Sequence, residues 1–380
     1  MVEDTPQIRI RMPSGFVFSN ETSHLEEAEY QMVGKVFSWS EALIAYRTAR
    51  HSDDSRSLPD NNWSPNKAQS GEIDGSVKNH FTSYALARSL DRDIIRKLLL
   101  YAQSFSGFQL ATWSPSHLRP WISHKLPDNL DELLRLLVVW PDQYYVMYKA
   151  ATQLLPQELR VPPPWRYGNV GWLDGEVIVN PETYRYHNHL RILWENQVFE
   201  AMRSAPGGVE PRIVEIGSGY GGLAYCLAKI FGNARILLID LPECLAFAAA
   251  YLSVVLPELE HCLVPPDAGG AISLTNGPGV TYVANFMIDR LAPDVIFDLA
   301  INTASLTEMT PQQIDGYASF VRSHANDASL FYERNSHLAD SWEMASELQM
   351  ILARHFSRMR ECQVSFKERN LRERPRLWQR

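Results

Sequence analysis

A strand, a glycine-rich turn and a helix follow one another directly in the second half of the chain, and no other feature restricts the fold as much. Residues 212–216 have the short β-branched pattern of a buried strand, and residues 222–231 carry mostly apolar side chains. The turn between them contains Gly217, Gly219 and Gly221, which allow a sharp bend and a close approach of a ligand to the backbone. Such a unit is typical of a parallel α/β sheet, with the turn at the carboxyl edge, where ligands bind.

The alternation of strand and helix continues from this unit to the end of the chain. Apolar runs of strand length alternate with longer segments of helical periodicity, and Pro242 lies near the first turn of one expected helix. We therefore predict an α/β fold built on a seven-stranded sheet. The expected strands are 212–216, 235–240, 280–283, 297–302, 329–333, 361–366 and 376–379, and the expected helices are 222–231, 242–256, 311–322 and 341–356.

Helical periodicity dominates the first 160 residues. Pro141 should divide the last helical segment into two helices, because proline removes a backbone donor and clashes with the preceding turn. An Asp174-Gly175 hairpin turn and a helix from Pro181 then lead toward the glycine loop. The helical segments are 25–50, 81–87, 94–105 and 130–155. We predict a large helical cap over 1–160 that binds the acceptor or forms a dimer interface, a hairpin and helix over 161–205, and a cofactor domain over 206–380.

The bulk composition excludes several classes of protein. A net charge of −8 differs from the basic footprint of a nucleic-acid-binding protein. The longest apolar run, Cys244–Leu256, is too short to span a bilayer, so a buried helix is expected there. The four cysteines lack metal-ligand spacing, and the first residues lack the pattern of a signal peptide. We expect a cytoplasmic protein that binds neither nucleic acid nor membrane.

The glycine loop has two competing interpretations. Gly217 to Gly222 satisfies the G-x-G-x-x-G fingerprint of a dinucleotide site, and Asp240 follows at about the right distance. Glu215, however, extends the motif to E-x-G-x-G-x-G, and an anion there would repel a pyrophosphate but accept hydrogen bonds from a positively charged amine. Asp240, at the end of the second strand, can accept both hydroxyls of a ribose. A turn that needs glycines for packing alone is the structural alternative.

The residues around this loop resemble a known family. Residues 213–224 (IVEIGSGYGGLA), followed by residues 239–243 (IDLPE), look like a class I S-adenosylmethionine-dependent methyltransferase. Residues 302–309 (NTASLTEM) and 331–335 (FYERN) are similar to the sugar O-methyltransferases in particular. The resemblance runs from about residue 167 to the C-terminus. It implies a Rossmann-like seven-stranded sheet, S-adenosyl-L-methionine as cofactor and S-adenosyl-L-homocysteine as product.

The same resemblance assigns roles at the cofactor site. Glu215 and the glycine loop would hold the methionine part, Asp240 the ribose, and Leu241 would lie against the adenine. Residues after the third strand would contact the adenine edge, and residues at the end of the fourth would face the sulfonium. The complete set is Glu215, Gly217, Ser218, Gly219, Tyr220, Gly221, Asp240, Leu241, Asn285, Phe286, Asn302 and Thr303.

An alcohol acceptor must lose a proton, so a general base is expected near the carboxyl edge of the sheet. Glu308 shares a position with the family motif, although it also fits a capping role before the helix near Pro311. His337 and His187 are the other candidates. His187 and His189, two residues apart on a helix, cannot both face one site. The residues expected to contact the acceptor are Tyr184, His189, Ser305 and Asn335.

We expect no metal site, while a site assembled from distant carboxylates such as Glu308 and Asp298 stays open. The first functional hypothesis is methyl transfer to a hydroxyl of a sugar or glycosylated small molecule in natural-product biosynthesis, by a monomer or homodimer. A phenol, carboxylate or amine acceptor is the alternative within the same enzyme class. An NAD(P)-binding oxidoreductase and a non-catalytic scaffold are the alternatives from other classes.

Overall fold

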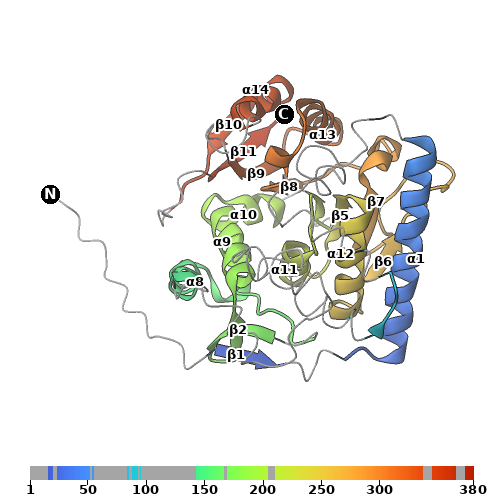
Figure 1. Ribbon diagram of the computed structural model, residues 1–380. Helices are drawn as coiled ribbons and strands as arrows, with labels where there is room; N and C mark the ends of the chain where they lie inside the picture. The colour runs from blue at the N-terminus through green and yellow to red at the C-terminus, as the bar shows by residue number, and fades with distance from the viewer. Residues whose placement is uncertain are drawn as a thin grey trace.

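A computed structural model describes residues 16–19, 24–51, 54, 84, 88–92, 95, 143–166, 169–203, 210–336, 345–364 and 373–380. Most of the expected helices over 81–87 and 94–105 lies outside the described residues, as do the first part of 130–155 and the candidate base His337. The described part is organised around one central sheet covered by helices (Figure 1).

The central sheet has eight strands in the order β10-β11-β9-β8-β4-β5-β7-β6. All neighbouring pairs from β6 to β9 are parallel, and β11 runs antiparallel to both β9 and β10. The sheet is therefore the mostly parallel, Rossmann-like sheet that the sequence predicts. Its strands are β4 (Arg212–Ile216), β5 (Arg235–Asp240), β6 (Glu260–Leu263), β7 (Gly279–Ala284), β8 (Leu299–Thr303), β9 (Leu330–Ser336), β10 (Arg358–Glu361) and β11 (Glu373–Gln379).

The strand order fixes where a ligand can bind. The five strands β7-β5-β4-β8-β9 follow the doubly wound order 3-2-1-4-5, so the chain reverses its direction of travel across the sheet between β4 and β8. A crevice opens outside the carboxyl ends of the strands at such a point, and ligands of open α/β sheets bind there. The antiparallel strand β11 departs from the arrangement of six parallel strands that is usual for dinucleotide-binding domains.

The seven-strand prediction is wrong by one, because β6 extends the edge of the sheet beside β7. Its sequence, EHCL, is short and lacks both an apolar run and a clear alternation, so only pairing with β7 makes it a strand. The strand expected at 361–366 lies earlier, at 358–361, where its residues are exposed and paired with β11. The other predicted strands agree with the structure to within three residues at either end.

Helices cover both faces of the sheet. They are α11 (Gly222–Phe231), α12 (Pro242–Val255), α13 (Pro311–Ser323), α14 (Ala345–His355) and α1 (Glu27–Arg50). Every residue of α12 except Ser253 is buried, and α1 packs along this helix. Figure 1 shows α1 standing beside the β6–β7 edge of the sheet. The apolar run over residues 244–256 is thus a buried helix, as predicted. None of the helices in the described ranges combines the length and apolar composition that a bilayer crossing requires.

A smaller unit precedes the sheet. The predicted hairpin is present as β2 (Asn169–Asp174) and β3 (Val177–Val179), and β1 (Phe16–Ser19) pairs with β2 as a third strand. The helix predicted from Pro181 is α9 (Pro181–Glu195), whose N-terminal cap Asn180 accepts a 2.8 Å hydrogen bond from the Thr183 amide. The remaining elements are α8 (Gln143–Leu154), the 3₁₀ turn η2 (Gln157–Leu159) and α10 (Val198–Arg203).

Candidate cofactor site

The glycine loop joins β4 to α11 at the carboxyl edge. Gly217 and Gly221 adopt φ values of +74° and +88°, in the left-handed region that favours glycine. A Cβ atom on Gly217 would lie 2.1 Å from Ser305 Oγ, and one on Gly221 would lie 2.8 Å from Leu252 Cδ1. Both positions therefore require glycine for backbone conformation and for space. The Gly217 amide also donates to the Ile239 carbonyl oxygen at 2.8 Å, which ties the loop to the end of β5.

Asp240 ends β5 beside the loop. Its Oδ2 accepts a 3.0 Å hydrogen bond from the Gly219 amide, and its Oδ1 accepts one of 2.7 Å from the Leu241 amide. Burial raises the pKa of Asp240 to about 6, and the two amides act in the opposite direction because they stabilise the carboxylate. The Cys244 thiol also hydrogen-bonds to this carboxylate, so the protein uses three of its about four acceptor positions and one stays open to a ligand hydroxyl.

Glu215 lies within β4, and its side chain is buried beneath the same loop. Its Oε2 has no hydrogen-bond partner among the described residues, and neither has the buried hydroxyl of Ser218. Burial and the nearby charge of Asp240 raise the pKa of Glu215 to about 8, although a hydrogen bond from the Ala224 amide stabilises the carboxylate. Buried polar atoms without partners are rare in native proteins and call for an explanation. A turn that only packs offers none, whereas a polar ligand in the loop would satisfy them.

Two buried asparagines hold the next stretch of the carboxyl edge. Asn302, at the end of β8, donates from Nδ2 to the Ile216 carbonyl oxygen (2.8 Å) and to Ser305 Oγ (2.5 Å). Asn335, near the end of β9, donates 3.0 Å hydrogen bonds to Asn302 Oδ1 and to Glu333 Oε2. Both asparagine side-chain oxygens accept the Leu306 amide, at 3.2 and 3.1 Å. The amides therefore join the ends of β4, β8 and β9 to the start of the 3₁₀ turn η4 (Leu306–Glu308).

This network engages three side chains that were expected to contact the cofactor or the acceptor. Asn302 and Asn335 are fully buried and their amides bond to the protein. Ser305 packs against Gly217 and accepts from Asn302, so it supports the loop. Thr303 is half-buried at the edge of the sheet. Ala304 follows it with φ +68°, a strained backbone conformation of the kind that concentrates at functional sites.

Glu308 is half-buried at the end of η4. The capping alternative for this residue is wrong, because Thr310 caps α13: its hydroxyl accepts from the Gln313 amide (3.3 Å), and Gln313 Oε1 accepts from the Thr310 amide (2.9 Å). The Glu308 carboxylate lies close enough to Cys244 to act on its thiol. Burial and the charges of Asp240, Glu243 and Glu308 raise the pKa of the Cys244 thiol well above its usual range.

A joint metal site of Glu308 and Asp298 is also excluded. Asp298 precedes the first residue of β8 and accepts a 2.8 Å hydrogen bond from the Arg212 amide at the amino edge of the sheet. Glu308 follows the last residue of β8, so the length of the strand separates the two carboxylates. Within the described ranges, no three His, Cys, Asp or Glu side chains gather in a geometry suited to a metal ion.

His187 and His189 point to different places, as their spacing predicts. His187 Nδ1 lies 2.6 Å from the Thr183 carbonyl oxygen, which can only accept, so Nδ1 carries the proton and Nε2 is a free acceptor in the neutral ring. Burial lowers the pKa of His187 to about 4, and Nε2 has no partner in the described part of the chain. His189 Nδ1 instead lies 3.0 Å from Tyr332 Oη in the middle of β9.

His189 and Tyr184, which we expected to contact the acceptor, both pack inside the protein. His189 is buried against β9, where burial and the charges of Arg334 and Arg185 lower its pKa. Tyr184 is buried in a separate hydrophobic cluster with Tyr145, Tyr148, Ala151 and Val179. Amphipathic spacing places both residues on the helix correctly but does not show which neighbour each face meets.

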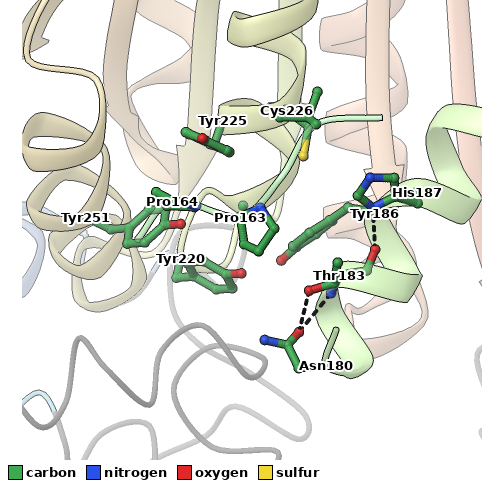
Figure 2. Close-up of a pocket in the computed structure, with 12 residues that line it drawn as sticks. Pro163, Pro164, Asn180, Thr183, Tyr186, His187, Tyr220, Tyr225, Cys226 and Tyr251 are labelled. Carbon is green, nitrogen blue, oxygen red and sulfur yellow. Dashed lines mark hydrogen bonds between the residues drawn. The ribbon is translucent and has the colours of Figure 1, made fainter. Parts of the chain in front are cut away.

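A pocket rich in tyrosine adjoins the glycine loop (Figure 2). It lies between α9, α11, α12 and the proline connector before β2, and contains His187 among its lining residues. The Tyr220 ring leaves the loop and packs edge-on against Tyr251 (5.0 Å between centroids) and Tyr186 (6.1 Å). Only the backbone of Tyr220 thus stays in the cofactor loop. The lining residues are Val161, Pro163, Pro164, Asn180, Thr183, Tyr186, His187, Tyr220, Gly222, Tyr225, Cys226 and Tyr251.

The residues predicted at the adenine side lie next to one another. Asp240 pairs with Ala284 in the sheet, so Leu241 and Asn285 leave adjacent strands at the same level. Phe286, in the 3₁₀ helix η3 (Asn285–Arg290), stacks on Tyr46 with ring centroids 6.1 Å apart and an angle of 16° between the planes. His51 contacts the same ring at 5.1 Å. The N-terminal helix α1 thus reaches this side of the site, which the sequence did not indicate.

No protein-family profile and no curated protein sequence matches the chain. Among solved structures it is similar to the N-methyltransferase NodS of Bradyrhizobium japonicum with S-adenosyl-L-homocysteine (16% identity, TM-score 0.34, covering 61% of this chain and 98% of that one). It is also similar to an S-adenosylmethionine-dependent methyltransferase of Clostridium acetobutylicum (13% identity, TM-score 0.34, covering 50% of this chain and 89% of that one). A third similar structure is a ribosomal protein L11 methylase of Lactobacillus delbrueckii (14% identity, TM-score 0.31, covering 51% of this chain and 79% of that one). Identities and TM-scores of this size transfer neither an activity nor a substrate to this chain.

Proposed function

We propose that the protein is an S-adenosylmethionine-dependent O-methyltransferase that acts on a hydroxyl of a sugar or glycosylated small molecule. The observation that carries the proposal is the pair of carboxylates at the glycine loop. Glu215 offers a buried oxygen without a partner among the described residues, and Asp240 offers an open acceptor position to a ribose hydroxyl. A nucleoside with a positively charged amino-acid tail matches both groups.

Charge favours this cofactor over a dinucleotide. Glu215 and Asp240 lie close enough for the charge of Asp240 to raise the pKa of Glu215, and a pyrophosphate in the loop would oppose the ionisation of both carboxyl groups further. The ammonium group of the methionine part would instead pair with Glu215 and relieve the desolvation of its carboxylate. When bound, S-adenosylmethionine supplies a methyl group on a positively charged sulfur, a leaving group that needs no acid catalyst.

The remaining task of the protein is to align and deprotonate the acceptor. Glu308 is our candidate for the general base. The turn that carries it is fixed by the Leu306 amide, which Asn302 and Asn335 hold, and by the 3.1 Å hydrogen bond from the Glu308 amide to the Ser305 carbonyl oxygen. A base on a rigid turn keeps its carboxylate in one place while the acceptor binds.

The tyrosine pocket has room for about one water-sized group, which suits a single hydroxyl of an acceptor and not a whole ring. His187 Nε2 is an unprotonated acceptor without a partner in the described residues, and a ligand hydroxyl could donate to it. We also place the protein in the cytoplasm, because all four of its cysteines are free thiols.

The test is turnover with methyl-labelled cofactor. Purified protein is incubated with labelled S-adenosylmethionine and separate panels of glycosides, phenols, carboxylic acids and amines, and S-adenosylhomocysteine is quantified. We expect label to be transferred to a glycoside hydroxyl and to be lost in Asp240→Ala. Transfer only to phenols, acids or amines would retain the methyltransferase but reject the sugar acceptor, and oxidation or reduction of NAD(H) in place of transfer would reject both.

A further inference from the structure

Helix α1 is fastened across the loops that follow three neighbouring strands. Trp39 Nε1 donates to the Val264 carbonyl oxygen just after β6 (2.7 Å), and Ser40 Oγ donates to the Pro242 carbonyl oxygen just after β5 (2.8 Å). Tyr46 stacks on Phe286 just after β7. All three contacts lie at the carboxyl edge, on the half of the sheet where Asp240 would hold a ribose. The helix thus belongs to the wall of the cofactor site, although about 160 residues separate it from β4.

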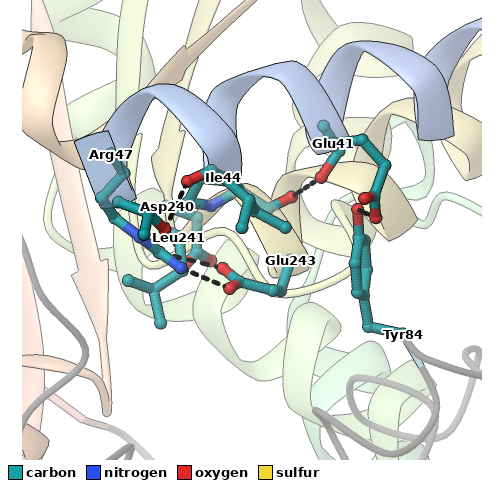
Figure 3. Close-up of polar contacts among 10 residues, drawn as sticks. Glu41, Ile44, Arg47, Tyr84, Asp240, Leu241 and Glu243 are labelled. Carbon is teal, nitrogen blue, oxygen red and sulfur yellow. Dashed lines mark hydrogen bonds and ion pairs between the residues drawn. The ribbon is translucent and has the colours of Figure 1, made fainter. Parts of the chain in front are cut away.

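A buried ion pair is the strongest of these connections (Figure 3). Arg47 Nη2 lies 2.6 Å from Glu243 Oε1, and Nη1 lies 3.1 Å from Oε2, so the guanidinium holds the carboxylate with two hydrogen bonds. The two side chains are only 8% and 6% exposed. Arginine suits such a pair because its planar fork matches both carboxylate oxygens.

The position of Glu243 gives this pair a consequence for the cofactor site. Glu243 lies in the first turn of α12, three residues after Asp240, and its negative charge opposes ionisation of Asp240. Glu215 adds a second carboxylate nearby. Arg47 therefore introduces a positive charge among acidic groups that would otherwise repel one another. A buried carboxylate that lost this partner would have to be neutralised or to move.

We propose that helix α1 forms the outer wall of the nucleoside subsite and that Arg47 is a positioning residue, whose two hydrogen bonds to Glu243 hold the first turn of α12 in place beside Asp240, the residue that would accept the ribose. Tyr46 and Phe286 form the aromatic part of the same wall. The inference rests on the proposed function, because the subsite is that of the cofactor. It assigns to the N-terminal segment a part in cofactor binding, in addition to the expected cap over the acceptor.

The test is a double-mutant cycle on ligand binding with the full chain. Binding of S-adenosylhomocysteine and of 5′-methylthioadenosine, which retains only the nucleoside half, is measured by calorimetry for wild type, Arg47→Met, Glu243→Gln and Arg47→Met/Glu243→Gln. We expect Arg47→Met to weaken both ligands about tenfold or more, and the double variant to recover most of that loss, because no buried charge is left unpaired.

Arg88→Met is the matched control, since Arg88 forms an exposed ion pair, at 2.9 Å, with Glu41 of helix α1, the helix that also carries Arg47. Its binding should equal that of wild type, and circular dichroism should show all variants folded. Wild-type affinity in Arg47→Met, or a double variant as weak as Arg47→Met, would overturn the inference. If wild type binds S-adenosylhomocysteine and only the inference fails, the proposed function stands; if folded wild type binds neither ligand, the proposed function fails first.

Discussion

The protonation of Glu215 makes cofactor affinity depend on pH. Burial and the charge of Asp240 raise the pKa of Glu215 to about 8, so the carboxyl group is mostly protonated at pH 7 in the free protein. The bound ammonium group favours the ionised form, which lowers this pKa and expels the proton. Binding therefore becomes stronger as the pH rises toward 8, because less work is needed to ionise Glu215.

The size of the effect follows from the pKa. With a pKa of about 8 in the free protein and a much lower one in the complex, affinity should rise about eightfold between pH 6.5 and 7.5, and about 0.9 proton should leave per ligand at pH 7. Asp240, with a pKa of about 6, changes the affinity over this range by only about 1.3-fold, in the same direction.

Calorimetry of S-adenosylhomocysteine binding in buffers of different ionisation enthalpy measures both quantities. Glu215→Gln should bind more weakly at pH 7.5, release almost no proton and show a nearly flat pH profile. Glu258→Gln is the control, because Glu258 is exposed and pairs with Lys229 on the surface. Proton release that persists in Glu215→Gln, or a wild-type affinity that does not change between pH 6.5 and 7.5, would refute the reasoning.

The raised pKa of Glu215 also predicts how the stability of the ligand-free protein depends on pH. Because the folded-state pKa of Glu215 is raised, its contribution to stability is complete below its ordinary pKa of 4.5 and is lost as the pH rises through about 8. Urea unfolding should therefore show a smaller decrease in the free energy of unfolding from pH 6 to 8 in Glu215→Gln than in wild type; parallel curves would contradict this.

Two further predictions concern the loop and the base. Gly217→Ala should lower the free energy of unfolding by about 2–3 kcal/mol, because of the positive φ and because the new methyl group displaces the Ser305 hydrogen bond. Gly232→Ala has a φ of +62° but open space around the new methyl group, so it should lower the free energy of unfolding by only about 1–2 kcal/mol. Urea titrations measure both changes. An equal decrease in the free energy of unfolding in both variants would show that Ser305 moves aside without cost. Glu308→Gln should reduce kcat about 10²- to 10⁴-fold while the affinity for S-adenosylhomocysteine is unchanged; an unaltered kcat would remove Glu308 as the base.

The fold of the C-terminal half could be predicted from the sequence because its signals are local. The loop glycines, Glu215 and Asp240 lie within one strand–turn–helix–strand unit, and backbone geometry alone brings them together. Even a local pattern can be misassigned. The sequence allowed Glu308 to cap α13, but Thr310 forms the cap together with Gln313, three residues later.

The parts that escaped prediction depend on contacts between distant segments. Arg47 and Glu243 are separated by 196 positions, and each reads in isolation as an ordinary charge on a helix end. The Asn302–Asn335 hydrogen bond requires β8 and β9 to be neighbours. Helix periodicity placed Tyr184 on the helix face expected to contact the acceptor. In the structure Tyr184 packs in a hydrophobic cluster with side chains from other elements, which periodicity does not specify. The helical cap over 1–160 and the homodimer stay predictions.

The most direct measurement of the central claim is a competition between two cofactors for one loop. Wild type and Asp240→Ala are titrated at pH 7.5 with S-adenosylhomocysteine and with NADH. We predict micromolar or tighter binding of S-adenosylhomocysteine, a loss of at least about 10-fold in Asp240→Ala, and no competition by NADH. Binding of NADH that S-adenosylhomocysteine does not displace would show that the glycine loop serves a dinucleotide, and the methyltransferase account would be wrong.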